Sequence, residues 1–337
     1  MSAASPRCSI VIPVFNRADQ IGDSLDSVWA QSFGDFEVVL VDDGSTDDLE
    51  AALANHTDDR LRVVRQENAG PAAARNLGMS EARGELIAYL DSDDRWLPNH
   101  LEATIAELDR CNSAAVYSPM IVDRGVGRYA VRPSRGMRDG ESFGDYRFVH
   151  AELLLVSTLV HRTELRDQIA WDERLFYGDV DQYLLDLVRV TGPIPMLPYP
   201  TALYNDITGP EKLSQVSVYG RDSQRFRNFL AWLDEQDALS PQAVAAHRAR
   251  NLSGVQERRL DTVRLLAEAY HAGAMTMSGA TREYIRARNP RAYRYLIDTY
   301  VYLRGKPLEE LIEVQAHDQS RDRCQICANT TTHGVRS

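Results

Sequence analysis

Short hydrophobic runs alternate with amphipathic segments through the first ninety positions. Four apolar runs predict buried strands, at residues 9–14, 36–41, 61–64 and 86–90. Between them, apolar residues recur at three- and four-residue spacing. This predicts helices over residues 21–29 and 72–81 and a short helix that ends at Leu53. Because strands that alternate with helices build βαβ units, the pattern predicts an α/β fold whose central sheet is mostly parallel and flanked by helices.

The pattern is less regular further along the chain. A helix is predicted over 98–110 and a strand over 114–117. Residues 123–145 are rich in Gly and Arg with weak periodicity, which favours a loop or an irregular hairpin. Residues 153–160 suit a strand or a buried helix, and a further helix is expected to end near Val190.

From about residue 220 the periodicity is helical, and no Asp-rich strand ends occur there. We therefore expect three parts: an α/β domain over 7–215, a helical C-terminal extension over 216–318 and a flexible tail over 319–337.

Polar or special residues follow each of the four predicted strands. They are residues 13–16, Asp42 with Asp43, residues 68–70 and residues 91–94. The carboxyl ends of parallel strands meet at one edge of a sheet, where ligands bind, so we expect a nucleotide site there. The sequence has neither a GxGxxG after the first strand nor a GxxxxGK[ST], which excludes the dinucleotide fingerprint and the P-loop.

Three carboxylates come directly after the fourth strand, at Asp91, Asp93 and Asp94. Crowded carboxylates repel one another unless a cation lies among them, and Mg²⁺ is often held by one or two carboxylates together with substrate phosphates. Residues 89–94 alone would suit equally well an acidic turn that caps the next helix. The polar ends of the three earlier strands favour the metal site.

Composition narrows the choice of partners and location. The 337 residues carry a formal net charge of −11 with no long basic run, which argues against nucleic acid as a partner. The first residues have no apolar signal-peptide core, and no apolar run is long enough to span a bilayer. With four cysteines, a cytoplasmic protein with reduced thiols is expected, with contact to the inner face of the membrane as a further option.

Four motifs, in this order, resemble the nucleotide-sugar domain of family 2 glycosyltransferases with the GT-A fold. They are SIVIPVFNR at 9–17, VDDGSTD at 41–47, the segment 68–78 that begins NAG and ends ARNLG, and LDSDD at 90–94. The resemblance covers about residues 7–205. Residues 171–190 and 199–208 further resemble the bacterial spore-coat polysaccharide type within that family.

The resemblance implies a metal-dependent inverting glycosyltransferase that moves a sugar from a UDP-sugar to a hydroxyl acceptor. The acceptor could be a glycan, a lipid-linked molecule or a small molecule, in polysaccharide, glycoconjugate or glycosylated natural-product biosynthesis. The implied nucleotide-binding residues are Pro13, Val14, Phe15, Asn16, Asp42, Asn68, Gly70, Arg75, Asp91 and Ser92. The implied ligands of Mn²⁺ or Mg²⁺ are Asp93, Asp94 and Asp91, with Asp93 as the metal-binding acid of the DxD motif.

The acceptor hydroxyl must also lose a proton, which requires a carboxylate as general base on the opposite face of the sugar. By the resemblance this base is Asp179, with Asp181 as the alternative. Family members usually have a Glu-Asp pair here, whereas this chain has Gly178 before Asp179. A non-catalytic nucleotide-sugar-binding module on the same scaffold is therefore the alternative function.

Two further segments leave alternatives open. Cys324 and Cys327 form a CxxC near two histidines, which suits either a structural zinc site or a loose polar tail. Residues 281–304 interleave arginines with tyrosines. That segment suits packing within the chain, a homodimer contact or a peripheral contact with an anionic membrane.

Overall fold

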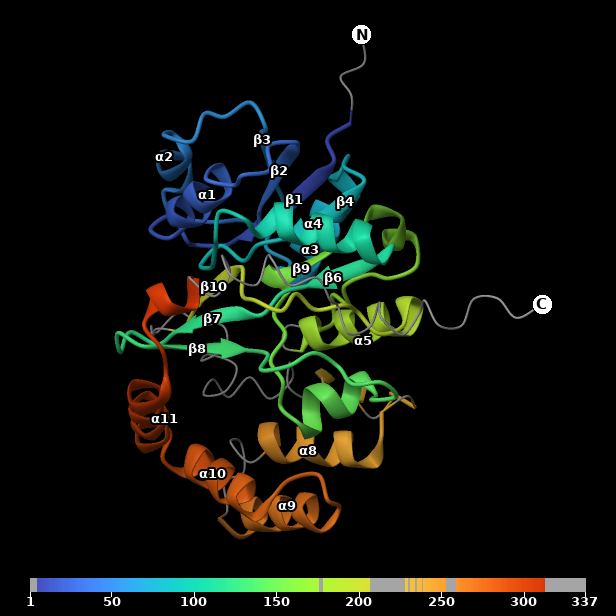
Figure 1. The fold of residues 1–337 in the computed structure, drawn as a ribbon, viewed down its shortest axis with the longest axis vertical. Coiled ribbons are helices and arrows are strands. Elements are labelled where there is room, and N and C mark those ends of the chain that lie inside the picture. Colours follow the sequence, from blue (N-terminus) through green and yellow to red (C-terminus); the bar gives the residue numbers. More distant parts are fainter. Residues whose placement is uncertain are drawn as a thin grey trace, which may run out of the picture.

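The computed structural model describes residues 5–175, 178–206, 228–229, 231–233, 235–237, 239–252 and 259–312. Within these ranges the α/β part lies at one end of the long axis of the molecule, and the C-terminal helices lie at the other (Figure 1). A second, smaller sheet lies between the two ends.

Six strands of the described chain form the main sheet, in the order β3-β2-β1-β4-β9-β6. Their bounds are β1 Cys8–Val14, β2 Phe36–Asp42, β3 Leu61–Arg65, β4 Leu86–Tyr89, β6 Ala115–Tyr117 and β9 Leu159–Arg162. Strands β1 to β4 are mutually parallel where they pair, and β9 runs antiparallel between β4 and β6. The prediction of a mostly parallel central sheet is confirmed.

Helices cover both faces of this sheet because its central strands are apolar on both sides. Helices α1 (Ile21–Trp29), α2 (Leu49–Leu53) and α4 (His100–Cys111) pack on the face that carries Ile10 and Ile12. Helices α3 (Pro71–Glu81) and α5 (Asp179–Thr191) pack on the face that carries Val11 and Tyr89. Alternate residues of a strand point to opposite faces, so one continuous apolar run supplies two cores.

The second sheet was only partly predicted. Its four described strands are β5 (Arg95–Trp96), β10 (Ala202–Asn205), β7 (Met120–Asp123) and β8 (Tyr129–Arg132), in that order. Strand β8 lies within the segment 123–145, predicted as a loop or irregular hairpin, and forms a hairpin with β7, which ends where that segment begins. A π-helical turn follows at Asp145–Val149. Strands β5 and β10 are too short to give an alternating pattern, so the sequence did not reveal them.

Residues 153–160 were predicted to form a strand or a buried helix, but most of them form neither. A 3₁₀ turn occupies Val156–Thr158, and β9 begins only at Leu159. The buried residues of this turn, such as Val156, belong to the core, so its apolar character reflects burial rather than a regular strand.

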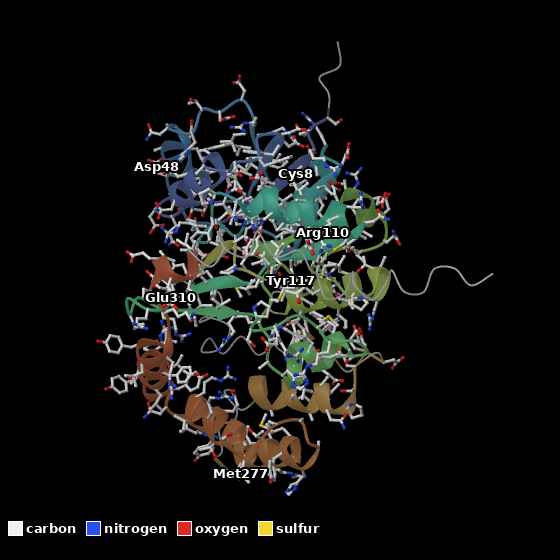
Figure 2. All side chains as sticks on the ribbon, viewed as in Figure 1. Cys8, Asp48, Arg110, Tyr117, Met277 and Glu310 are labelled. Atoms are coloured by element: carbon white, nitrogen blue, oxygen red, sulfur yellow. The ribbon has the colours of Figure 1, made fainter. Side chains whose placement is uncertain are left out.

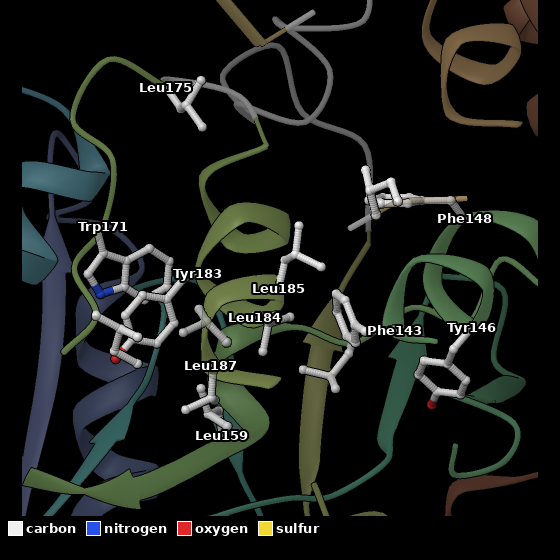
Figure 3. Packing of buried hydrophobic residues seen from close by; sticks show 14 of the residues in the cluster. Phe143, Tyr146, Phe148, Leu159, Trp171, Leu175, Tyr183, Leu184, Leu185 and Leu187 are labelled. Carbon is white, nitrogen blue, oxygen red and sulfur yellow. The ribbon is translucent and has the colours of Figure 1, made fainter. Parts of the chain in front are cut away.

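A tight aromatic core places the start of α5 beside the edge of the sheet (Figure 3). Trp171 stacks flat on Tyr183 of α5, with ring centroids 4.0 Å apart and planes 2° from parallel. Leu184 and Leu187 of α5 belong to the same core, as does Leu159 of β9. Rings stacked in this way fix the helix laterally, so the residues at its first turn have a defined position.

The C-terminal part of the described chain is helical, as predicted. Its helices are α8 (Pro241–Leu252), α9 (Arg259–His271), α10 (Met277–Arg288) and α11 (Pro290–Arg304). Tyr129 of β8 and Lys306, just after α11, exchange backbone hydrogen bonds of 3.0 Å in both directions. The exact division at 215 and 318 stays a prediction, and the 319–337 tail with Cys324 and Cys327 lies outside the described residues. None of the described helices is long and apolar enough to cross a bilayer.

We predict that Gly78→Ala lowers the free energy of unfolding by about 1–3 kcal/mol, because the added methyl group would overlap the Val11 side chain where α3 crosses β1. Urea denaturation checks this. Gly34→Ala is the matched control, since a methyl group there meets nothing within 4 Å. Its free energy of unfolding should change by less than about 1 kcal/mol. Equal stability of the two variants would contradict the close packing of α3 on β1.

Candidate functional site

The loops after β1 and β2 are tied to each other at the edge of the main sheet. Asn16 has a left-handed backbone (φ 51°), and its N–H donates to Ser45 Oγ at 3.1 Å. The Thr46 N–H donates to Asn16 Oδ1 at 2.8 Å, and the Ser45 N–H donates to Asp42 Oδ1 at 2.8 Å. The structure therefore brings together Asn16 and Asp42, two of the residues predicted to bind nucleotide.

Residues 13–16 differ in exposure, and so they differ in the contacts that they can make with a ligand. Val14 is buried, so its side chain faces the core. Its carbonyl accepts from the Asp43 N–H at 2.9 Å. Phe15 is exposed and Pro13 is half-buried. Asp42 is 3% exposed, and its Oδ2 lies 3.0 Å from Arg65 Nη1. Each carboxylate oxygen can accept a second hydrogen bond, so Asp42 can still receive a donor.

Asp43 anchors the third loop, a role that the sequence reasoning did not assign. Its Oδ1 accepts from Gln66 Nε2 at 2.7 Å and from the Ala69 N–H at 2.8 Å, and its Oδ2 accepts from the Gly70 N–H at 2.9 Å. Asn68 Nδ2 donates to the carbonyl of Asp43 at 3.0 Å. Residues 68–70 are thus held beside the end of β2. The sequence signal for this role was the position of Asp43, directly after Asp42 at the end of a strand.

Arg75 joins three elements at the centre of the site. Its Nη2 donates to Asp91 Oδ1 at 2.7 Å, and its Nη1 donates to Asp179 Oδ2 at 2.7 Å. The guanidinium lies 4.7 Å from the centroid of the Trp171 ring. Arg75 is 5% exposed, so these charge-assisted contacts are made in a largely dry environment. They connect α3, the end of β4 and the start of α5.

The two candidate bases lie in different ion pairs. Asp179 shares Arg75 with Asp91, whereas Asp181 is paired with Arg147 of the π-helical turn, whose Nε lies 2.6 Å from Asp181 Oδ1. Burial raises the pKa of Asp179, and the nearby Asp91 adds to this, while Arg75 opposes it. Of the two, Asp179 is therefore the one that the structure brings to the acidic strand end.

The acidic strand end has an inner and an outer side. Asp94 is 2% exposed, and its Oδ2 accepts from the Ser157 hydroxyl at 2.6 Å. Burial, together with Asp93 and Asp91, raises the pKa of Asp94 well above its usual range. Asp93 is half-buried, and the Asp91 side chain is 30% exposed. Ser92 is buried between them.

This donor set fits a divalent cation that also binds a ligand. Burial, together with the carboxylates of Asp93 and Asp91, raises the pKa of Asp94, and a cation would relieve the repulsion among the three carboxylates. In the part of the chain that the structure describes, no three His, Cys, Asp or Glu side chains are grouped to hold an ion by themselves. The remaining ligands would then be phosphate or water oxygens, as is common for Mg²⁺.

Part of the first half of the chain matches a known protein family. Residues 9–158 match the family model described as glycosyl transferase family 2. Over these residues the chain is similar to family 2 glycosyltransferases. The match contains every predicted nucleotide- and metal-binding residue and ends before Asp179.

Curated relatives of this glycosyltransferase domain match over part of their length. The amylovoran biosynthesis glycosyltransferase AmsB of Erwinia amylovora is 26% identical over 210 residues, which are 59% of this chain and 70% of AmsB. Other relatives are much longer, and the chain spans 23% of two of them.

Solved structures show that the fold is GT-A. Residues 1–349 of S. aureus TarS, in complex with UDP-GlcNAc, match with a TM-score of 0.58 at 21% identity, over 87% of this chain and 91% of that one. The mannosyltransferase PcManGT of Pyrobaculum calidifontis, in complex with GDP-Man and Mn²⁺, matches with a TM-score of 0.54 at 18% identity, over 89% and 86%.

A surface hollow of about 510 Å³ lies beside the glycosyltransferase domain's helix α3. It is lined by Gln66, Glu67, Ala69, Ala73, Asn76, Leu77, Ser80 and Glu173. Asn76 Nδ2 donates to Glu173 Oε1 at 2.9 Å across it. None of the residues predicted to bind nucleotide or metal lines this hollow, but Ala69, between Asn68 and Gly70, does, so the hollow borders their loop.

We predict that Asp43→Asn lowers the free energy of unfolding by about 1–3 kcal/mol, because an amide replaces one of the two oxygens that hold residues 66–70. Thermal unfolding with a calorimetric enthalpy checks this. Asp47→Asn is the control, since Asp47 accepts one exposed hydrogen bond from the Ala18 N–H, and it should change the stability by less than about 1 kcal/mol. A neutral Asp43→Asn would show that the loop is held by other contacts.

Proposed function

We propose that the chain is a metal-dependent inverting glycosyltransferase, which moves a sugar from a UDP-sugar to a hydroxyl acceptor in polysaccharide, glycoconjugate or natural-product biosynthesis. The observation that carries this proposal is the Arg75 bridge between the acidic end of β4 and Asp179 of α5. In this proposal the buried guanidinium of Arg75 lies between the carboxylates that bind the metal and the carboxylate that acts as the base. UDP-GlcNAc in TarS and the name of AmsB support the donor class and the pathway class.

The nucleoside is held, in this proposal, where the loops after β1 and β2 are tied together. The backbone of residues 13–16 lies along one side, and Asp42 accepts from the ring N–H of uracil. The exposed Phe15 ring is available for stacking contact. Asn68 and Gly70 border the same sheet edge through their hydrogen bonds with Asp43, and Ser92 follows β4 at that edge.

Asp93 and Asp91 are the proposed ligands of Mn²⁺ or Mg²⁺, because both are partly accessible. Asp94 has its Oδ2 engaged by Ser157 and its Oδ1 3.4 Å from the Asn205 N–H, so it supports the cluster from inside. A divalent cation bound here would neutralise the charge that develops on the leaving diphosphate. Mn²⁺ in PcManGT supports a metal of this class.

Asp179 acts as the general base in this proposal. It takes the proton from the acceptor hydroxyl while that oxygen forms a bond to the anomeric carbon and the bond to the diphosphate oxygen breaks on the opposite face. One displacement inverts the anomeric configuration. Arg75 holds the carboxylate in place and favours its ionised form, against the effect of burial.

Two finer points belong to the proposal. The spore-coat type rests on the sequence pattern of residues 171–190 and 199–208. A cytoplasmic location rests on the composition and on the nucleotide-sugar donor, which the cytoplasm supplies.

We expect Mn²⁺ to raise the affinity for UDP at least about tenfold. Asp93→Asn should remove that increase, because a neutral amide replaces the carboxylate that binds the metal. Isothermal titration of UDP with and without Mn²⁺ measures this. Asp48→Asn is the matched control: Asp48 caps α2 away from the cluster and should leave the Mn²⁺ effect unchanged. If the unmodified protein bound UDP equally well with and without Mn²⁺, the assignment of the metal site would be wrong.

We expect Asp179→Asn to bind UDP normally and to lose transfer by about a hundredfold or more, because an amide cannot accept the proton. Asn keeps an oxygen for the hydrogen bond from Arg75, so the buried guanidinium stays paired. Donor hydrolysis and transfer to an acceptor panel, each with Mn²⁺, are the measurements. Asp181→Asn should retain transfer, since Asp181 faces Arg147.

The pH profile gives the same test in the unmodified protein. Burial raises the pKa of Asp179, so the transfer rate should fall as the pH drops through a value above the usual Asp range and level off at higher pH. If Asp179→Asn kept transfer and Asp181→Asn lost it, Asp181 would be the base. UDP-sugar binding with no turnover in any assay would favour the non-catalytic module.

A further inference from the structure

The outer face of α11 is apolar and aromatic although it is exposed. Rings project from this helix away from the rest of the molecule (Figure 2). The exposed residues and their exposed fractions are Tyr295 72%, Leu303 69%, Tyr302 61%, Tyr300 59% and Leu296 51%. Their spacing places them on one side of the helix, which we call the α11 face. A solvated helix normally presents charged residues there.

The polar contacts of α11 are on its inner side. Asp298 Oδ1 lies 3.0 Å from Arg124 Nε, and Asp298 Oδ2 lies 3.0 Å from Arg294 Nε. Val301, on the same side, is 5% exposed. The helix is therefore fixed to the β7–β8 hairpin by the ion pair between Arg124 and Asp298, and the residues of the α11 face point outward.

The charge around the α11 face is opposite to that of the whole chain. Residues 277–304 contain six arginines and two acids, Glu283 and Asp298, which gives a net charge of +4, whereas the chain carries −11. Arg304 is exposed and lies four residues after Tyr300, so it borders the α11 face. The described structure thus combines an apolar face with an exposed arginine at its border, in a segment of net positive charge on an acidic protein.

We propose that the α11 face binds the surface of an anionic lipid membrane. Tyrosine rings and leucines enter the boundary between headgroups and acyl chains, and exposed basic side chains such as Arg304 contact the anionic headgroups. Tyrosine suits this boundary because its ring is apolar and its hydroxyl stays hydrated. The proposal goes beyond the transferase reaction, since it concerns where the protein binds.

A second copy of the chain is the less suitable occupant. A two-fold contact would bring the same basic segment of each copy together, and like charges would repel. An anionic lipid surface instead attracts the arginines and repels the acidic remainder, so it orients the protein with the α11 face toward the membrane.

The test is co-sedimentation of the full chain with phosphatidylcholine vesicles that contain either no anionic lipid or about a third phosphatidylglycerol. We expect binding to the anionic vesicles and little binding to the neutral ones, with weakening at high salt. Arg304→Gln should weaken the binding about fivefold, which corresponds to about 1 kcal/mol per basic residue near the surface.

The combined variant Tyr295→Ser and Leu303→Ser should lose at least about tenfold in binding, because it removes apolar surface from the α11 face. Val63→Ser is the matched control: Val63 is also exposed, on β3 of the main sheet, and should bind like the unmodified protein. Circular dichroism and UDP affinity verify that each variant is folded.

Two results would overturn the proposal. One is the absence of binding to anionic vesicles at low salt. The other is a dimer in analytical ultracentrifugation that the combined variant converts to a monomer while its vesicle binding is unchanged. The second result would assign the α11 face to contact between copies of the chain.

Discussion

The site depends on one buried guanidinium that two carboxylates share. Arg75 lies 16 residues before Asp91 and 104 residues before Asp179, so the bridge holds together parts that are distant in the sequence. Removing one partner of such a pair leaves a buried charge and costs about 3–5 kcal/mol. The stack of Trp171 on Tyr183 matters for this reason: it fixes α5, and so Asp179, at the distance that the bridge requires.

The bridge leaves the site with an excess of negative charge. Four carboxylates, those of Asp91, Asp93, Asp94 and Asp179, lie in or beside one cluster, and Arg75 supplies one positive charge. Protonation of the buried Asp94 is one way to reduce the repulsion, and a bound cation is another. A diphosphate alone would add negative charge, so in the proposed function donor binding and cation binding support each other.

Much of the main sheet and of the site could be predicted because apolar strands end in polar residues at one edge. Strand ends of β1, β2 and β4 carry their ligand-type residues within a few positions, so periodicity finds them. Contacts such as Arg147 with Asp181, or Asp43 with residues 66–70, depend on how distant segments pack, and no local pattern contains that information. The short strands β5 and β10 were missed for the same reason: their pairing partners, and not their own residues, define them.

Gly178, which by the sequence resemblance stands where family 2 glycosyltransferases usually have Glu, has a steric explanation. Its backbone is left-handed (φ 80°), and a methyl group at this position would overlap the ring of Phe229. Phe229 is itself fully buried and belongs to the same core as Trp171. Any side chain at 178 would therefore displace part of the core that holds α5. Glycine here follows from the packing of the C-terminal part against the start of α5, and it gives no reason to expect that Asp179 has lost its chemistry.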